Sequence, residues 1–149
     1  MAIINSRINT HSASYRQNYA EMSKMVEKLN ELLQKSQFQG KERHIAKARK
    51  LDKLLARERI ELLLDEDSPF LELMPLTGLN QGGFGAGGTM VAGIGLVHGR
   101  LCGISANVGT NKGGAIDYFT LQKALRFNTI AAENGLPVIN LVESAGANL

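Results

Sequence analysis

The chain has one cysteine, Cys102, among its 149 residues. A single thiol excludes a disulfide within the chain and a zinc site built from several cysteines, and its scarcity indicates a reducing compartment. The sequence also lacks the run of roughly 20 apolar residues that a membrane-spanning helix needs. Its first 20 residues lack the apolar segment of a secretory signal peptide. We therefore expect a soluble, cytoplasmic protein that has no contact with a membrane.

A strong excess of charge is missing as well. The 17 basic and 14 acidic side chains leave a formal net charge of +3. Despite a pI near 9.1, this excess is too small to indicate nucleic acid as a partner. The chain is 44% hydrophobic, which is enough for the packed core of an ordinary domain.

Side chains typical of metal sites or covalent catalysis are scarce. His11, His44 and His98 are not spaced as metal ligands or as members of a triad, and we expect each of them at the surface. Ser144 lies outside a GxSxG motif and no histidine follows it, which argues against a serine nucleophile. Cys102 falls in a predicted strand and is expected in the core. The sequence therefore predicts no metal site in this chain.

The first 66 residues are highly charged and helical in pattern. They hold 13 basic and 9 acidic side chains, against 4 and 5 in residues 67–149. Apolar residues at helical spacing predict an amphipathic helix over residues 14–36, and Gly40 marks its end. A second periodic stretch, residues 45–64, fits two helices or one broken helix equally well. We expect residues 1–66 to form an N-terminal helical arm.

The second half, residues 67–149, is expected to be a separate α/β domain. Residues 78–114 hold 13 of the 16 glycines and no acidic residue. Two strand-like runs, residues 89–97 and 100–108, are separated by a two-residue turn and predict a β-hairpin. Residues 117–134 are helical in pattern, and a buried strand is expected over residues 138–142. Strand, helix and strand in this order imply a parallel crossover.

Two loops of small residues follow the strands that this crossover would place side by side. They are residues 109–114 and residues 144–148. Ligands of open α/β sheets bind beyond the carboxyl ends of strands, where main-chain N–H groups can stabilise a developing oxyanion. Glycine and alanine leave such N–H groups accessible, but they also serve tight packing. The loops are therefore either a binding site or a packing contact.

Four motifs occur in a characteristic order along the chain. They are ARERIELLLD at residues 56–65, GIGLVHGRLCGISAN at residues 93–107, KGG at residues 112–114 and LPVINLVESAGANL at residues 136–149. Together they resemble the carboxyltransferase β subunits of biotin-dependent acyl-CoA carboxylases, and most of all those for methylcrotonyl-CoA and geranyl-CoA. The resemblance extends from about Tyr19 to the last residue. It implies an α/β fold in which the helical arm precedes part of a crotonase-like ββα unit.

The resemblance also implies an activity. It is carboxyl transfer from carboxybiotin, carried on a partner α subunit, to an α,β-unsaturated acyl-CoA through an enolate. The peptide N–H groups of Ala145 and Gly146 would form the oxyanion hole. Further substrate-binding residues would be Lys112, Gly113, Gly114 and Ala147. The family assembles as homo-oligomers of β subunits, and in a eukaryote its place would be the mitochondrial matrix.

This chain departs from the family pattern in two ways. The family usually has Ser-Gly-Gly-Ala where this chain has Ser144 to Ala147 with an alanine at 145. The added methyl group is expected to narrow or redirect the acyl site. Family members are also several times longer, so we expect residues 67–149 to be an incomplete N-terminal carboxyltransferase domain that is inactive alone. The alternative from another functional class is a non-catalytic module that binds a protein partner through its helical arm.

Overall fold

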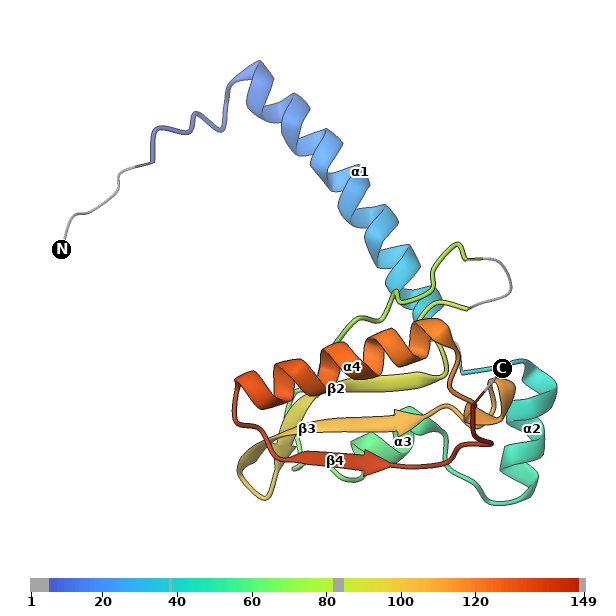
Figure 1. Ribbon diagram of the computed structural model, residues 1–149. Helices are drawn as coiled ribbons and strands as arrows, with labels where there is room; N and C mark the ends of the chain where they lie inside the picture. Colours follow the sequence, from blue (N-terminus) through green and yellow to red (C-terminus); the bar gives the residue numbers. More distant parts are fainter. Residues whose placement is uncertain (1–5, 38, 82–84, 148–149) are drawn as a thin grey trace. The chain divides into compact units, whose positions relative to one another are not determined.

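The structure, a computed structural model, describes residues 6–37, 39–81 and 85–147. The chain divides into two compact units, Met1–Gln34 and Lys35–Leu149. Helix α1 (Ala13–Ser36) makes up most of the first unit, and the second unit contains the sheet with the remaining helices (Figure 1). The division after Gln34 falls within residues 1–66, the stretch for which the sequence predicts a helical arm.

Helix α1 agrees with the amphipathic helix predicted over residues 14–36. The Ser12 hydroxyl accepts the Tyr15 N–H at 3.1 Å and so satisfies one free donor of the first turn. The apolar stripe of the helix remains exposed, since Tyr19, Met22 and Met25 are each 60–65% accessible. Within residues 6–37, 39–81 and 85–147, no helix combines the length and apolar character that membrane crossing requires.

The second periodic stretch forms two helices, α2 (Glu42–Lys50) and α3 (Ala56–Glu61). The Glu58 carboxylate accepts the Leu55 N–H at 2.7 Å at the start of α3 and pairs with Arg49 of α2. These contacts, with the one from Arg49 the larger, lower the pKa of Glu58. One acidic side chain therefore both caps α3 and ties it to α2.

A four-stranded mixed sheet occupies the centre of the second unit. Its order is β1 (Leu71–Glu72), β2 (Met90–Val97), β3 (Arg100–Asn107) and β4 (Val138–Leu141). Strands β1, β2 and β3 are antiparallel neighbours, whereas β3 and β4 are parallel. Helix α4 (Tyr118–Glu133) connects β3 to β4. The predicted hairpin and the predicted crossover are both confirmed.

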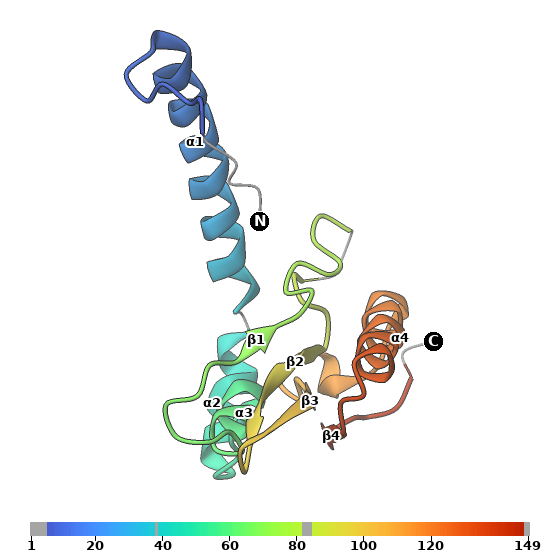
Figure 2. The same cartoon turned by 90° about the vertical axis from the view of Figure 1, so that its left-hand side faces the viewer.

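Helices cover both faces of the sheet. Figure 2 shows α3 on one side of β2 and β3 and α4 on the other. Ile60 of α3 packs against one face with Val91 and Ile104, while Phe127 of α4 packs against the other face with Met90 and Ala92. Because successive side chains alternate between two buried faces, β2 is apolar along its whole length, and β3 is apolar over most of its length, with Ser105 as the polar residue inside it. Cys102 is 5% exposed in the first cluster, which confirms its predicted place in the core.

Strand β4 differs from the prediction in its burial. A buried strand was expected over residues 138–142, but burial alternates along β4 and Val138 is 40% exposed. The physical reason is position: β4 lies at the edge of the described sheet with β3 as its one neighbour. A run of apolar residues therefore marks a strand here without marking full burial.

The hairpin turn between β2 and β3 is held by an acidic side chain from outside the hairpin. His98 and Gly99 both have positive φ angles, 50° and 72°, as a type I′ turn requires. Their N–H groups donate to the two oxygens of Asp65 at 2.6 and 2.7 Å. The Gly99 N–H, followed by the His98 N–H, lowers the pKa of Asp65.

Asp65→Asn should remove a pH-dependent part of the stability. The carboxylate is favoured in the folded chain, so its contribution is present above the unfolded pKa of about 4 and is lost as the pH falls through the lower folded value. The urea concentration at the midpoint of unfolding should be higher for wild type than for D65N near pH 7, and this difference should shrink towards pH 3. A gap that stays constant over this range would contradict the role given to the charge.

Lys123 is a charged side chain inside the α4 face of the core. It is 2% exposed, and its Nζ donates to the carbonyl oxygens of Gly87 at 3.2 Å and Met90 at 2.8 Å. Burial lowers its pKa to about 8, while the nearby Glu72 opposes this shift. The lysine thus ties α4 to the start of β2 at the cost of placing an ammonium group in the core.

Because the buried Lys123 ammonium group opposes folding, the free energy of unfolding should rise with pH in mildly alkaline solution. Between about pH 8 and the ordinary lysine value near 10.4, the unfolded chain binds the proton that the folded chain has released. Wild type should therefore gain up to about 1.4 kcal/mol per pH unit over Lys123→Met in that window. The measurement is urea unfolding of both proteins at several pH values, and parallel curves would contradict the buried titration.

Candidate functional site

The two small-residue loops lie side by side beyond the carboxyl ends of β3 and β4. The Ala145 N–H donates to the Gly113 carbonyl oxygen at 2.9 Å, and the Ile116 N–H donates to the Gly146 carbonyl oxygen at 2.9 Å. Ala147 also forms an isolated parallel bridge with Ile116. The crossover therefore brings both predicted loops together, and main-chain hydrogen bonds join them.

Gly114 is one of the predicted site residues whose place in the fold is set by packing. It is buried and has a φ of 68°, and a Cβ added to it would lie 2.2 Å from the Glu143 carbonyl oxygen. Gly113 is exposed, with a φ of 64°, and a Cβ there would lie 3.2 Å from the Ala145 methyl group. The close approach of the two loops therefore needs glycine at 114, while Gly113 remains accessible.

The two N–H groups predicted to form the oxyanion hole have different hydrogen-bond partners. The Ala145 N–H is already donated to Gly113, so in this conformation it is not free for a ligand. The Gly146 N–H donates to the Ser144 hydroxyl, two residues back, at 3.1 Å. Gly146 has a φ of 103°, and a Cβ added to it would have no neighbouring atom within 4 Å. Its N–H therefore has a local hydroxyl partner that side-chain rotation can remove.

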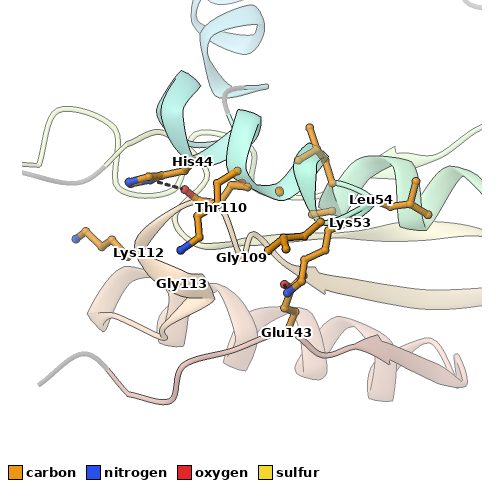
Figure 3. A pocket seen from close by; sticks show the side chains of 13 residues that line it. His44, Lys53, Leu54, Gly109, Thr110, Lys112, Gly113 and Glu143 are labelled. Atoms are coloured by element: carbon orange, nitrogen blue, oxygen red, sulfur yellow. Dashed lines mark hydrogen bonds and ion pairs between the residues drawn. The ribbon is translucent and has the colours of Figure 1, made fainter.

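A cavity of about 300 Å³ lies beside these loops. It is lined by α2, the segment between α2 and α3, the loop after β3, and Glu143, which precedes the second loop (Figure 3). Of the predicted site residues, Lys112 and Gly113 line it, whereas Gly114, Ala145, Gly146 and Ala147 do not. The full lining is His44, Lys47, Ala48, Leu51, Lys53, Leu54, Leu55, Ala56, Gly109, Thr110, Lys112, Gly113 and Glu143.

The lining of the cavity is rich in basic groups. Lys47, Lys53 and Lys112 contribute ammonium groups, and Glu143 is the single acidic residue in the lining. Lys53 lies 2.8 Å from a Glu143 oxygen (Figure 3), and Lys112 lies 3.9 Å from Asp117. The excess of positive charge makes the cavity suited to an anionic ligand.

His44 and the α2 side of the cavity were not foreseen as parts of a site. His44 was expected at the surface, but it is half-buried and its Nδ1 lies 3.0 Å from the Thr110 carbonyl oxygen. It thereby connects α2 to the loop after β3. The basic residues within 41–53 are compatible with an anion-binding site, but the same pattern also fits a solvated helix face.

Gly109 and Glu143 meet at the wall of the cavity. A Cβ on Gly109 would lie 2.8 to 3.1 Å from the carboxylate atoms of Glu143. The carboxylate is bound by Lys53 and lies 3.7 Å from Arg59. Glu143 is therefore engaged in ion pairs, in keeping with the structural role that its sequence context suggests.

No group of three or more histidine, cysteine, aspartate or glutamate side chains placed to hold a metal ion occurs among the described residues. The described residues of the site offer main-chain amides, ammonium groups, the His44 imidazole and the Glu143 carboxylate.

The comparisons with known proteins bear directly on this arrangement. A family described as "Carboxyl transferase domain" matches residues 47–149. The chain belongs to this family. The match includes α3, the hairpin, α4, β4 and both loops, whereas His44 and the first part of α2 precede it. The resemblance drawn from the four motifs is thus confirmed.

Relatives of known sequence lie among the acyl-CoA carboxylases. The chain is 44% identical over 147 residues to a probable biotin-dependent acyl-coenzyme A carboxylase beta2 subunit of Mycobacterium tuberculosis, covering 99% of this chain and 28% of that protein. It is 43% identical over 149 residues to the mitochondrial methylcrotonoyl-CoA carboxylase beta chain of Dictyostelium discoideum, covering 99% and 25%. The chain thus spans about a quarter of the length of these relatives.

Solved structures agree with the sequence relatives. The beta subunit of P. aeruginosa geranyl-CoA carboxylase matches with a TM-score of 0.83 and 41% identity, over 98% of this chain and 28% of that one. A transcarboxylase 12S structure matches with a TM-score of 0.73 and 28% identity, over 85% and 26%. The carboxyl transferase chain therefore has the mixed α/β fold of the crotonase-like carboxyltransferases, as predicted.

Gly114→Ala should be far more harmful than an alanine at a comparable open glycine. The new methyl group must displace the Glu143 carbonyl and separate the loops, so we expect a loss of roughly 3 kcal/mol in the free energy of unfolding. Gly99 has a similar φ of 72° but open space around it, and G99A should cost about 1 kcal/mol. Chemical denaturation measures both, and equal losses would contradict the packing role of Gly114.

Proposed function

We propose that this chain forms the acyl-CoA-binding part of a biotin-dependent acyl-CoA carboxyltransferase. The substrate class is an α,β-unsaturated acyl-CoA such as methylcrotonyl-CoA or geranyl-CoA. Membership of the carboxyl transferase family and the names of the relatives support the reaction class. The observation that carries the proposal is the Gly146 N–H, which lies beyond the end of β4 with the Ser144 hydroxyl as its partner.

The chemical task is to stabilise an enolate. When a thioester loses a proton from carbon, negative charge develops on the thioester oxygen, and N–H donors aimed at that oxygen lower the barrier. For an α,β-unsaturated acyl group the charge is shared with the γ carbon, but the oxygen remains its main site. A donor at the oxygen therefore serves both cases.

Gly146 is the first donor in this proposal. Rotation of the Ser144 side chain frees the Gly146 N–H without moving the backbone, because the contact is local and exposed. Ala145 serves as the second donor in a conformation in which its N–H leaves the Gly113 carbonyl. Ala147 and the Lys112–Gly114 turn then line the acyl group beside these donors.

The basic cavity provides a place for the charged part of the substrate. Coenzyme A carries phosphate groups, and Lys47, Lys53 and Lys112 offer ammonium groups at the wall next to Gly113. Since Gly113 also accepts the Ala145 N–H, a ligand that extends from the cavity past Gly113 reaches residues 144–147. The phosphates would add affinity and orient the thioester.

Carboxybiotin, when bound, supplies the carboxyl group. Ser144 to Ala147 are exposed among the described residues, which leaves this loop accessible to another part of the enzyme. We therefore assign this chain the substrate side and place the biotin-carrying subunit and further β-subunit parts opposite it. Within the chain, the residues bind the thioester, hold its oxygen and orient it.

A non-catalytic module is the second candidate. The exposed stripe of Tyr19, Met22 and Met25 on α1 favours it, because apolar side chains aligned on one helix face commonly bind another protein. Binding of a protein partner without any affinity for acyl-CoA would support this reading.

Gly146→Ala tests the oxyanion role. Alanine disfavours a φ of 103°, so the peptide plane should turn and methylcrotonyl-CoA should bind about tenfold more weakly, or by about 1.4 kcal/mol. Gly135, with a φ of 60° and open space around it, is the matched control beyond α4, and G135A should bind as wild type does. Titration calorimetry on the full chain measures the affinities. Equal binding by both variants and wild type would contradict the role of Gly146, and absence of binding by wild type would overturn the proposed function.

A further inference from the structure

We propose that Arg59, on α3, is a positioning residue that sets the spacing of the two site loops. This inference rests on the proposed function in so far as those loops bind the acyl-CoA. Its basis is the set of contacts made by one guanidinium group, which lies on α3 and reaches the ends of two strands at once.

The guanidinium contacts the last residue of each of the two parallel strands. Its Nη2 donates to the carbonyl oxygen of Asn107, the last residue of β3, at 2.5 Å. Its Nη1 donates to the carbonyl oxygen of Leu141, the last residue of β4, in a longer contact of 3.4 Å. Nη2 also lies 3.7 Å from the Glu143 carboxylate. A single side chain thus bridges the two points from which the loops depart.

Asn107 extends this bridge into the loops themselves. Its side-chain Nδ2 donates to the Gly114 carbonyl oxygen at 3.2 Å, and its Oδ1 accepts the Glu143 N–H at 3.4 Å. Arg59 binds the main chain of Asn107, and the side-chain amide of Asn107 binds both Gly114 in the first loop and Glu143 directly before the second loop. Displacement of Asn107 would be felt in both loops together.

An arginine at position 59 lowers the stability of the fold unless its hydrogen bonds to the two strands compensate. The side chain is 20% exposed, and its Nε is buried without a hydrogen-bond partner. Burying a charged group and an unpaired donor opposes folding. An apolar residue could fill the same space between α3 and the sheet, but it could not hold carbonyl oxygens on two strands. The planar fork of donors is what arginine provides and lysine does not.

Arg57 supplies a matched control on the same helix. Its side chain is 24% exposed and binds the Glu72 carboxylate at 2.8 Å. It also donates to the main-chain oxygens of Ser36 and Gln37. Arg57 therefore ties α3 to other segments, away from the ends of β3 and β4. Arg57→Ala should cost stability as Arg59→Ala does, without loosening the loops.

The experiment measures hydrogen exchange of the Ala145 and Ile116 amides by NMR on the full chain, because their hydrogen bonds join the loops. In R59A both amides should exchange about tenfold faster than in R57A at matched overall stability. Added guanidinium ion should slow the exchange in R59A, whereas methylammonium should not. Should R59A fail to fold, R59K replaces it, and its amides should exchange at rates between those of wild type and the tenfold increase.

Equal exchange in the Arg59 and Arg57 variants, or an equal effect of both cations, would overturn the inference. A parallel titration with methylcrotonyl-CoA should show affinity reduced about tenfold in R59A and unchanged in R57A. If wild type binds no acyl-CoA, the proposed function fails while the exchange measurement still decides the role of Arg59. If R59A binds methylcrotonyl-CoA more weakly but its amides do not exchange faster, Arg59 does not position the loops, although the proposed acyl-CoA site stands.

Discussion

The parallel pairing of β3 with β4 is the constraint on which the site depends. It brings chain segments more than thirty residues apart to one edge of the sheet and points both in the same direction. The loops that follow must then share a narrow space, which is possible because Gly114 leaves room for the Glu143 carbonyl. Main-chain hydrogen bonds between the loops complete the arrangement.

The elements with strong local signals could be predicted from the sequence. The hairpin had its His98–Gly99 turn between two apolar runs, and helix α4 had Asp117, whose side chain accepts the Thr120 N–H, at its start. The burial of β4 could not be predicted, because an apolar run does not reveal whether a strand has a neighbour on both sides. The burial of a strand depends on its position in the sheet, which the local sequence pattern does not reveal.

The site was predictable in part for a similar reason. Small residues after two strands indicated that the loops would meet, and the structure confirms this. It could not be seen that the Ala145 N–H would be donated to Gly113, since hydrogen bonds between distant loops depend on register. The basic cavity was also missed, because Lys47 and Lys53 gather there only once α2 turns towards the loop that holds Thr110.

The contact of Gly109 with the carboxylate of Glu143 has an evolutionary consequence. A larger residue at 109 would push the carboxylate of Glu143 aside, and a shorter acid at 143 would leave Lys53 and Arg59 without their shared counter-charge. A change at either position therefore alters the ion pairs of the Glu143 carboxylate. Sequences that descend from a common ancestor should therefore change the two positions in concert, with the size of one compensating the reach of the other.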